Sequence, residues 1–254
     1  MKTVVKIGGR AQSSPALGSV LAEAWHAAPG ELCVVHGGGD EISEMQRKLG
    51  RSPGFSGGRR VTSEEDIVVV RMVLSGLVNK RLVAVLAAAG VPAVGISGED
   101  GGFIEAQPLG IAEFGHVGLP ARVNSAVVAT LLGAGYLPVI SPLAKNADGH
   151  GALNVNGDDA AAAIAVATGA GELLLVADVD GVIGENGTVL DNLDVETARG
   201  LIASGTASKG MAAKLEAAHA ALAGGVPSVR IAPLAGILDS ALGTTMTLAA
   251  SLAA

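Results

Sequence analysis

A lysine and several glycines at predicted strand ends are the residues of this sequence best suited to binding an anion. Lys6 lies in the β-branched stretch Thr3 to Ile7, and Gly8 and Gly9 follow directly. A second apolar stretch runs into three consecutive glycines, residues 37–39. Glycine adopts positive φ without a steric cost, and its N–H groups can approach a ligand closely. Both stretches therefore suit a phosphate group, although a surface lysine before a tight turn would also give the first pattern.

A cluster of short polar residues precedes an alanine-rich stretch with the composition of a buried helix. Asn154, Asn156, Asp158 and Asp159 lie directly before the helix predicted for residues 160–168. One helix N-terminus needs one capping residue. The surplus polar groups therefore favour a ligand role over capping alone.

Three further cations stand where a ligand could use them. Lys214 falls in the first turn of a helix predicted for residues 211–222. A cation there opposes the helix dipole, so we expect a compensating partner such as a phosphate. Arg59 and Arg60 end a loop rich in glycine and serine. Arginine binds carboxylates through two parallel hydrogen bonds, which makes a ligand role as reasonable as a solvated pair.

These residue types suit phosphoryl transfer, in which catalysis consists mainly of positioning and of stabilising spread negative charge. The sequence contains neither the P-loop pattern nor the dinucleotide-binding glycine pattern. It also offers no obvious general base. None is needed if the acceptor is a carboxylate, because a group with a pKa near ~4 is already ionised at neutral pH.

Strands and helices alternate along the chain, which predicts an α/β fold: a three-layer αβα sandwich with a mostly parallel open sheet. The longest helical pattern covers residues 62–89, with Thr62 and Glu65 at the spacing of a capping box. Its apolar residues occupy more than one stripe, so we expect burial on more than one side. The protein interior or a second copy of the chain would explain this equally well.

Composition argues against several classes of protein. The formal net charge is −7 and no run of Lys or Arg occurs, so nucleic acid is not an expected partner. The longest uncharged stretch, residues 123–144, is interrupted by glycines and prolines and is not expected to span a membrane. The beginning of the chain lacks a signal-peptide pattern, so we expect a cytoplasmic protein. Cys33 is the single cysteine and is interpreted as a buried apolar residue.

Eight short motifs occur in order along essentially the whole chain: Val5-Lys6-Ile7-Gly8-Gly9, Val35-His36-Gly37-Gly38-Gly39, Arg60-Val61-Thr62, Gly115-His116-Val117-Gly118, Gly135-Tyr136-Leu137-Pro138-Val139, Asn154-Val155-Asn156-Gly157-Asp158, Asp178-Val179-Asp180-Gly181-Val182, and Lys209-Gly210-Met211 with Lys214. Each motif is weak by itself, but the ordered set is specific. It resembles the amino acid kinase superfamily, which has the carbamate kinase-like fold, and within it the N-acetylglutamate kinase family.

This resemblance implies ATP-dependent phosphorylation of the side-chain carboxylate of N-acetyl-L-glutamate, an early step of arginine biosynthesis. Mg²⁺ would be carried on ATP, with no metal site on the chain itself. By position in the motifs, Lys6 and Lys214 would stabilise the transferring phosphoryl group and Asp158 would orient the two lysines. Arg60 and Asn154 would hold the α-carboxylate and amide region of the substrate.

The resemblance also assigns the glycine turns and the nucleotide site. Gly38 and Gly39 would bind the substrate, and Gly8 and Gly9 would bind the nucleotide, each through N–H groups close to the transferring phosphoryl. The other residues implied to line the nucleotide site are Asp178, Val179, Asp180, Gly181, Val182, Ile183, Thr206, Ala207, Ser208, Lys209, Gly210 and Met211.

Family resemblance further implies an amino-acid-binding lobe of about residues 1–170 and a nucleotide-binding lobe of about residues 171–254. It implies a homodimer built on the long helix, about residues 62–89. Relatives inhibited by arginine carry an extra helix before the first strand, and no such helix is predicted here. We therefore expect a dimer that is insensitive to arginine.

Two other functions stay open on the sequence. Residues 75–82 also resemble kinases that phosphorylate aminoadipate or glutamate attached to an acidic carrier protein. The acidic balance of the chain and the motif at residues 115–118 favour the free N-acetylated amino acid. A non-catalytic module that senses nucleotides or amino acids could share the fold, but such a module has no use for Lys6, Asp158 and Lys214 together.

Overall fold

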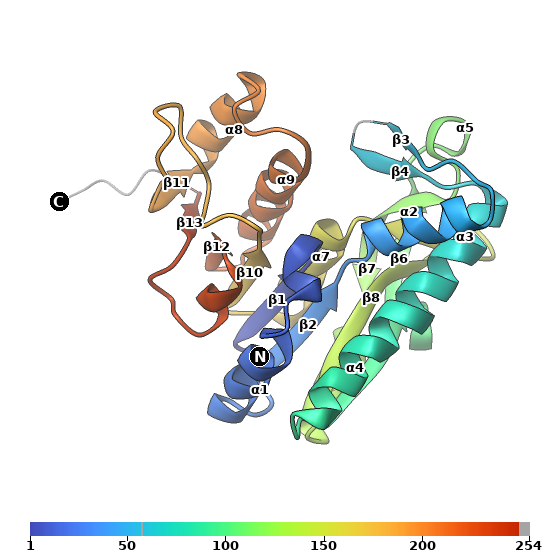
Figure 1. Cartoon of the computed structure of the whole chain (residues 1–254), viewed down its shortest axis with the longest axis horizontal. Coiled ribbons are helices and arrows are strands. Elements are labelled where there is room, and N and C mark those ends of the chain that lie inside the picture. Colours follow the sequence, from blue (N-terminus) through green and yellow to red (C-terminus); the bar gives the residue numbers. More distant parts are fainter. Residues whose placement is uncertain (57, 249–254) are drawn as a thin grey trace.

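The computed structural model describes residues 1–56 and 58–248, which form a large mixed sheet with helices on both faces and a separate small hairpin (Figure 1). The strands are β1 Thr3–Ile7, β2 Leu32–His36, β3 Gly54–Ser56, β4 Arg59–Val61, β5 Ala93–Gly98, β6 Ile104–Pro108, β7 Val117–Val123, β8 Leu137–Asn146, β9 Ala152–Val155, β10 Glu172–Val176, β11 Asn192–Asp194, β12 Ser228–Ala232 and β13 Thr244–Thr247. The helices are α1 Leu17–Ala27, α2 Gly39–Lys48, α3 Glu64–Arg71, α4 Asn79–Ala88, α5 Ile111–Phe114, α6 Ser125–Gly133, α7 Gly157–Thr168, α8 Val195–Ala203 and α9 Lys209–Ala223. A π-helical segment η2, Met72–Val78, and the 3₁₀ turns η1 Gly9–Ser13, η3 Asp100–Gly102 and η4 Leu234–Ile237 complete the described elements.

Strand order in the main sheet is β11-β13-β12-β10-β1-β2-β8-β6-β7-β9, and β5 also pairs with β8. Most neighbours are parallel; the pairs β12–β13, β6–β7 and β8–β9 are antiparallel. The two-stranded sheet β3–β4 stands apart as a hairpin. This arrangement confirms the prediction of a mostly parallel open sheet.

Successive residues of the central strands face opposite helical layers, as the period-2 geometry of a strand requires. Val4 packs in a core that contains residues of α7 and α9. Val5 and Ile7 pack instead with residues of α1 and α4. The predicted three-layer sandwich is therefore confirmed. Cys33 is fully buried in the first of these cores, and burial raises the pKa of its thiol, which agrees with its interpretation as an apolar residue.

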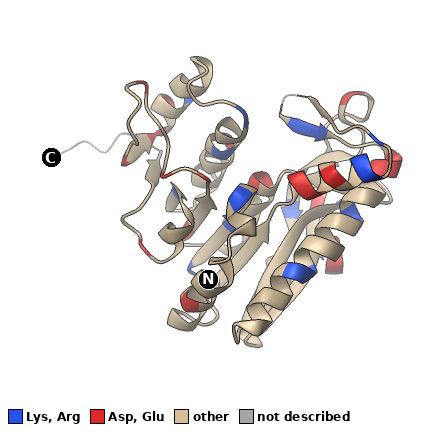
Figure 2. Cartoon of the chain, viewed as in Figure 1, with Lys and Arg blue, Asp and Glu red and all other residues tan. Residues whose placement is uncertain are grey.

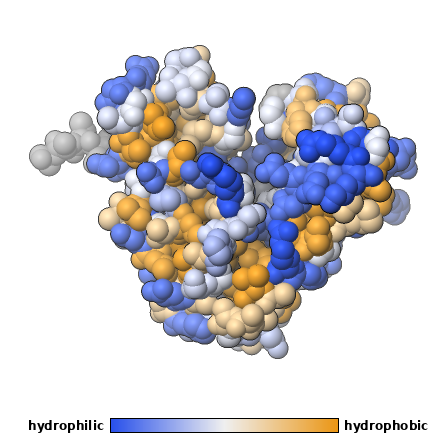
Figure 3. All heavy atoms as spheres, in the orientation of Figure 1, coloured by the Kyte–Doolittle hydropathy of each residue, from blue (hydrophilic) through white to orange (hydrophobic). Residues whose placement is uncertain are grey.

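Three parallel strands bring the predicted functional loops to one edge of the sheet. β1 lies between β2 and β10, with Lys6 opposite Val35 on one side and Leu175 on the other. The glycine turns after β1 and β2 and the loop after β10 consequently emerge side by side. Parallel α/β sheets bind ligands at this carboxyl edge. Figure 3 shows the molecule hollowed at this end, between the part that carries α9 and the part that carries the β3–β4 hairpin.

The long predicted helix is present but is not a uniform α-helix. α3, η2 and α4 follow one another with helical dihedral angles at both junctions. The predicted cap, Thr62 with Glu65, is wrong by one residue. Ser63 Oγ accepts a hydrogen bond from the N–H of Asp66, and the Asp66 side chain accepts one from the N–H of Ser63. Two polar pairs with the same spacing overlap here, and the structure uses the second, in which the Asp66 carboxylate also binds Arg51.

A π-helical turn also explains why the apolar pattern of the long helix covers two faces. Val68, Met72, Leu77 and Val85 are each 42–52 % exposed. The step from Met72 to Leu77 is five residues, which a π turn, with its i→i+5 hydrogen bonds, accommodates on one face. The opposite face, which includes Val70, is buried in the core.

Lys214 lies one turn deeper than predicted. α9 begins at Lys209, not at Met211, so Lys214 is in the second turn. The argument from the helix dipole therefore does not apply to this lysine, and its partner is a carboxylate described below.

Among the described residues, no helix is both long and apolar enough to cross a membrane. The division into lobes of residues 1–170 and 171–254 stays a prediction, since β1 and β10 belong to one continuous sheet. Residues 249–254 of the predicted second lobe lie outside the described residues.

Candidate active site

Two lysines from opposite ends of the chain meet on one carboxylate oxygen. Lys6 Nζ lies 2.9 Å and Lys214 Nζ 3.0 Å from Oδ1 of Asp158. The three side chains are only 7–12 % exposed. Asp158 is fixed in turn by Asn156, which caps α7 and accepts a hydrogen bond from the Asp158 N–H at 2.7 Å.

Two glycines make room for Lys6. A Cβ atom at Gly8 would lie 2.8 Å from Lys6 Nζ, and one at Gly157 would lie 3.0 Å from Lys6 Cε. A side chain at either position would therefore displace the Lys6 ammonium group from its present place. The glycines of the strand-end turns thus serve the lysine as well as any ligand.

Burial and the neighbouring charges shift the pKa values of Asp158 and Lys214 in this cluster. Burial alone would raise the pKa of Asp158, but the positive charges of Lys6 and Lys214 outweigh burial, and the pKa lies below its usual value. Burial, with repulsion from Lys6, lowers the pKa of Lys214 to about 8. The cluster carries a net positive charge when both lysines are protonated, which suits a transferring phosphoryl group.

The glycine turn after β2 presents free backbone donors beside this cluster. Gly38 is buried and has φ 152°, a conformation open only to glycine. In the described part of the chain, neither the Gly38 N–H nor the Gly39 N–H has a hydrogen-bond acceptor. Both residues line a cavity of about 170 Å³. Unpaired N–H groups at a helix start suit the oxygens of an anionic ligand.

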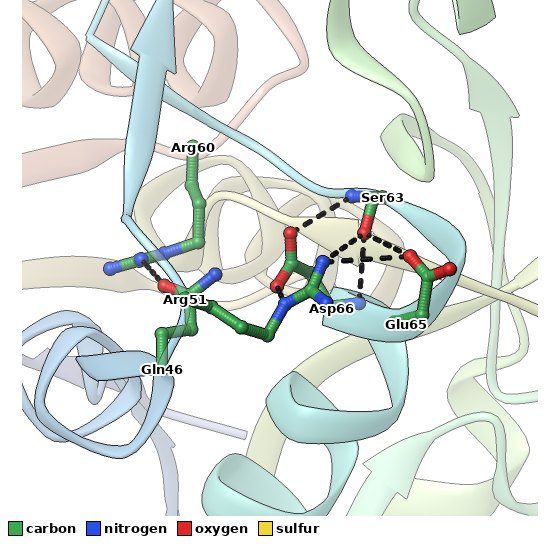
Figure 4. Close-up of polar contacts among 6 residues, drawn as sticks. All are labelled: Gln46, Arg51, Arg60, Ser63, Glu65 and Asp66. Atoms are coloured by element: carbon green, nitrogen blue, oxygen red, sulfur yellow. Dashed lines mark hydrogen bonds and ion pairs between the residues drawn. The ribbon is translucent and has the colours of Figure 1, made fainter. Parts of the chain in front are cut away.

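Arg60 closes one side of this cavity and is held by α2. Its Nη1 donates to Gln46 Oε1 at 2.6 Å (Figure 4). Its Nη2 donates to the carbonyl oxygen of Gly39 at 2.6 Å and to Ser43 Oγ at 2.8 Å. A guanidinium has five N–H donors. These contacts use three of them and leave one on Nε and one on Nη1. The Arg60 guanidinium carbon also lies 4.8 Å from the centre of the Phe55 ring, which covers it from the hairpin.

A second network anchors the segment that carries Arg60. Arg51, which follows α2, donates through Nε to Asp66 Oδ1 at 2.7 Å and through Nη2 to Ser63 Oγ at 3.0 Å (Figure 4). Burial alone would raise the pKa of Asp66, but hydrogen bonds from Arg51 and Ser63 outweigh burial and hold it at about 2. These contacts tie the start of α3 to the residues that follow α2. β4, which carries Arg60, lies between these two segments in the sequence.

Arg59 and Arg60 take different roles, although they are neighbours. The Arg59 side chain turns to α7, where its Nη1 lies 2.6 Å from Oδ2 of Asp159. Burial raises the pKa of Asp159, against the effect of this arginine. Asn154 lines the cavity and donates from Nδ2 to Thr62 Oγ1 at 3.1 Å. The surplus polar residues before α7 thus all have defined partners.

The predicted nucleotide residues lie on the other side of the hollow, in the loop after β10 and at the start of α9. Asp178 accepts hydrogen bonds from the N–H groups of Arg10 and Ala11, which ties the β10 loop to the turn after β1. A Cβ atom at Gly9 would lie 2.5 Å from this carboxylate. Val179, Asp180 and Ile183 are exposed, whereas Gly181 and Val182 are buried.

The start of α9 is open to a ligand. Thr206, Ser208, Lys209 and Gly210 are exposed, Ala207 is buried and Met211 is intermediate. Ser208 makes no side-chain cap to this helix. Lys209 has φ 50°, the one positive φ of a non-glycine residue among those described. Such strain is common where backbone is shaped for a ligand. Figure 2 shows basic residues here and, across the hollow, on the β3–β4 hairpin.

Several residues of the site escaped sequence reasoning. Ser43 and Gln46, which hold Arg60, were not identified from the sequence. Asp159 and Arg59 were both identified, but their pairing was not. The positions of Ser43 and Gln46, four and seven residues after Gly39, do place them on one face of α2 with it. His36 and Asn79 form a buried hydrogen-bonded pair, considered below.

The lysine pair and the unpaired N–H groups of the glycine turn are chemically suited to the phosphates of a nucleotide. Among residues 1–56 and 58–248, no cluster of three or more His, Cys, Asp or Glu side chains could hold a metal ion.

Comparisons with known proteins agree with this description of a phosphoryl-transfer site. The model of the amino acid kinase family matches residues 1–233. The chain is 45 % identical over 201 residues to the acetylglutamate kinase of Geobacillus kaustophilus, covering 79 % of this chain and 77 % of the relative. It is 41 % identical to the acetylglutamate kinase of Geobacillus stearothermophilus, covering 90 % and 88 % of the two chains.

Among solved structures, that of smu.665 from Streptococcus mutans is similar, with a TM-score of 0.85 and 30 % identity, over 97 % of this chain and 98 % of that one. The chain belongs to the amino acid kinase family.

Proposed function

We propose that this chain is an ATP-dependent kinase that phosphorylates the side-chain carboxylate of N-acetyl-L-glutamate, in arginine biosynthesis. The observation that carries the proposal is the shared oxygen of Asp158, which holds Lys6 and Lys214 beside each other at the sheet edge. Relatives named acetylglutamate kinase, at 41–45 % identity, support this choice of substrate.

The reaction needs charge stabilisation more than proton transfer. An oxygen of the substrate carboxylate attacks the γ-phosphorus of ATP, a new P–O bond forms, the bond to the bridging β–γ oxygen breaks, and ADP leaves. A carboxylate is already ionised at neutral pH, so no base is required. Lys6 and Lys214 stabilise the oxygens of the transferring group, and Asp158 keeps the two ammonium groups in place.

Acceptor binding falls to the cavity beside the glycine turn. Arg60 has two free N–H donors for the α-carboxylate, and Asn154 lines the same cavity. Gly38 and Gly39 offer N–H groups where the acceptor oxygen and the phosphoryl group meet. Gly8 and Gly9 face the phosphates from the β1 side. Bound Mg²⁺ would neutralise part of the phosphate charge.

The nucleotide lies, in this proposal, across the loop after β10 and the start of α9. The open helix start attracts phosphate, and the neighbouring loop of residues 178–183 forms the opposite wall. A cytoplasmic location stays a prediction.

We also propose a homodimer through α3, η2 and α4. The apolar residues on one face of this long helix, Val68, Met72, Leu77 and Val85, are each about half exposed in the described chain. A second copy of the same helix is self-complementary to such a stripe and would bury it.

A hydroxylamine trap for acyl phosphate tests the substrate. The purified chain, ATP and Mg²⁺ are incubated with N-acetylglutamate, glutamate, aspartate, or aminoadipate and glutamate linked to a carrier protein. We expect hydroxamate mainly with N-acetylglutamate. Product with a carrier-linked acceptor alone would replace the proposal by the second function. Nucleotide binding without any product would favour a sensing module.

A further inference from the structure

His36 lies in the core directly behind the glycine turn, and both of its ring nitrogens are engaged. The residue is fully buried. Nδ1 lies 2.7 Å from the carbonyl oxygen of Gly37, and Nε2 lies 3.1 Å from Nδ2 of Asn79. Burial lowers the pKa of His36 to about 4, so the ring is neutral at physiological pH and carries one proton.

The partners of Asn79 determine which nitrogen carries this proton. Asn79 Nδ2 also donates to the carbonyl oxygen of Val139 at 2.9 Å, and Asn79 Oδ1 accepts from Lys80 Nζ at 3.0 Å. The amide orientation is therefore fixed, with Nδ2 facing the ring. Since Nδ2 can only donate, Nε2 accepts and Nδ1 carries the hydrogen. His36 consequently donates to Gly37.

This hydrogen bond fixes the direction of the next N–H group. The carbonyl of Gly37 and the N–H of Gly38 belong to one peptide unit, and the described residues include no cis peptide. In a trans peptide the C=O and N–H point in opposite directions. With its oxygen held by the ring, the peptide directs the Gly38 N–H away from His36, on the side of the acceptor cavity that Gly38 lines.

The neighbouring peptides are held by the backbone: the Gly37 N–H donates to the Ile7 carbonyl oxygen at 2.8 Å, and the Gly38 carbonyl oxygen accepts from the Ile42 N–H at 3.0 Å. The peptide between Gly37 and Gly38 has the His36 ring as the partner of its oxygen. Glycines stand on both sides of it, so rotation of the peptide meets no Cβ atom. Packing limits where the turn lies: a Cβ atom at Gly38 would be 2.7 Å from Leu74 and 3.3 Å from Val78, both in η2. Asn79 follows η2 directly. The π-helical segment η2 thus supplies the side chains that pack against Gly38, and it positions Asn79, whose amide orients His36.

We propose that His36 is a positioning residue that holds the Gly38 N–H toward the transferring phosphoryl group. The proposal rests on the kinase function proposed above. His36 does not touch the substrate; it acts through one peptide unit, and Asn79 acts through His36. The simpler interpretation, a core histidine whose hydrogen bonds only satisfy its own polar atoms, predicts a loss of stability without a specific loss of turnover.

Two variants separate these interpretations. In His36→Asn, the side-chain Nδ2 can take the place of Nδ1 and keep the donor to Gly37. In His36→Gln, the longer side chain extends toward Asn79 and leaves the Gly37 carbonyl without that donor. Both replacements remove the ring and its packing. Their thermal unfolding, measured on the full chain, reports the common structural cost.

Turnover gives the decisive measurement. With N-acetylglutamate and ATP, we expect kcat of His36→Gln to fall roughly tenfold to hundredfold, approaching the loss of an oxyanion donor, and both KM values to stay within about threefold. We expect His36→Asn to keep kcat within about fivefold of wild type. Equal kcat losses in the two variants, or a loss expressed only in KM, would overturn the proposal.

The wild-type chain distinguishes this proposal from the function on which it rests. If wild type phosphorylates another acceptor of the panel, the assignment of substrate fails and the same kcat ratio is measured with that acceptor. If wild type phosphorylates none, both proposals fail. An active wild type with equally impaired variants overturns the role of His36 alone.

Discussion

Arg59 Nη1 lies 2.6 Å from Asp159 Oδ2, and this ion pair joins the β3–β4 hairpin to the first turn of α7. Both side chains are less than one quarter exposed. Arg59 and Arg60, both on the hairpin, line the cavity beside the glycine turn. The pair therefore holds one wall of the cavity to the helix that carries Asp158.

Replacing Arg59 by Met should loosen this wall. We expect KM for the acceptor to rise about threefold to tenfold with little change in kcat, because the lysine cluster is untouched. Steady-state kinetics with N-acetylglutamate as the varied substrate would measure this. A fall in kcat at unchanged KM would contradict the role given to the pair.

A second substitution, at Asp159, tests the contribution of this ion pair to stability. Arg59→Met leaves the Asp159 carboxylate partly buried without a cation, which costs about 1–3 kcal/mol. Arg59→Met with Asp159→Asn removes that charge as well, so the double variant should unfold at a higher temperature than the single one. If the second substitution lowers the melting temperature further, the carboxylate has another stabilising partner.

Lys214→Ala should impair the chemical step. Lys214 is one of two ammonium groups on Asp158, and in the proposed function it stabilises the transferring phosphoryl group. We expect kcat to fall at least about a hundredfold while KM for ATP changes within a few-fold. Lys48→Ala, which removes an exposed lysine of α2, is the matched control and should leave both constants unchanged. If Lys214→Ala instead raises KM for ATP about a hundredfold and leaves kcat unchanged, Lys214 serves only to bind the nucleotide.

Activity should decline on the alkaline side as Lys214 loses its proton. The pKa of Lys214 is lowered to about 8 by burial and by Lys6. In the proposed function the protonated form is the one that stabilises the phosphoryl group. We therefore expect kcat/KM for ATP, which reports the free enzyme, to fall as the pH rises through about 8. Bound phosphates favour the ammonium form, so the fall in kcat should come at higher pH.

Asp158→Asn gives a second test of the same assignment. The carboxylate of Asp158 raises the pKa of Lys214 against the effect of burial. Its removal should shift the alkaline fall of kcat/KM to lower pH, together with a loss of activity. An alkaline fall at the same pH in the variant would mean that another group titrates.

The exposed stripe on the long helix predicts the oligomeric state. Light scattering should give the mass of two chains for wild type, and Leu77→Glu should shift the protein to one chain because it places a charge in the apolar contact. Leu238→Glu, at an exposed apolar residue outside this helix, should remain dimeric. A monomeric wild type, or a dimer that tolerates Leu77→Glu, would exclude this interface.

Much of the site could be predicted because it consists of strand ends. Lys6 and the glycines after β1 and β2 are recognisable where a strand pattern stops, and parallel strands bring their carboxyl ends to one edge. The polar residues before α7 could also be recognised, because the helix needs one capping residue and the structure uses Asn156 for it. The other polar residues at this position therefore needed a different explanation. Lys214 was singled out by a helix-dipole argument that does not hold, since α9 starts two residues earlier than predicted.

The contacts between elements could not be predicted in this way. Gln46 reaches Arg60 from α2, and Asn79 reaches His36 from α4. These pairs depend on how helices pack against the sheet, which hydrophobic periodicity leaves undetermined. The π turn in η2 was equally hidden, because a step of five residues between Met72 and Leu77 breaks the helical period that identifies a face.

The central place of β1 has a consequence for how the chain is made. β1 and β2 leave the ribosome well before β10, and β2 can cover one edge of β1 early. Its other edge pairs with β10, where Thr3 lies opposite Glu172. Until residues 172–176 are synthesised, this edge of β1 has unpaired N–H and C=O groups. Asp158 likewise lacks its Lys214 partner until α9 is synthesised. The nascent chain therefore passes through a long stage with an open, apolar strand edge, at which chaperones can act.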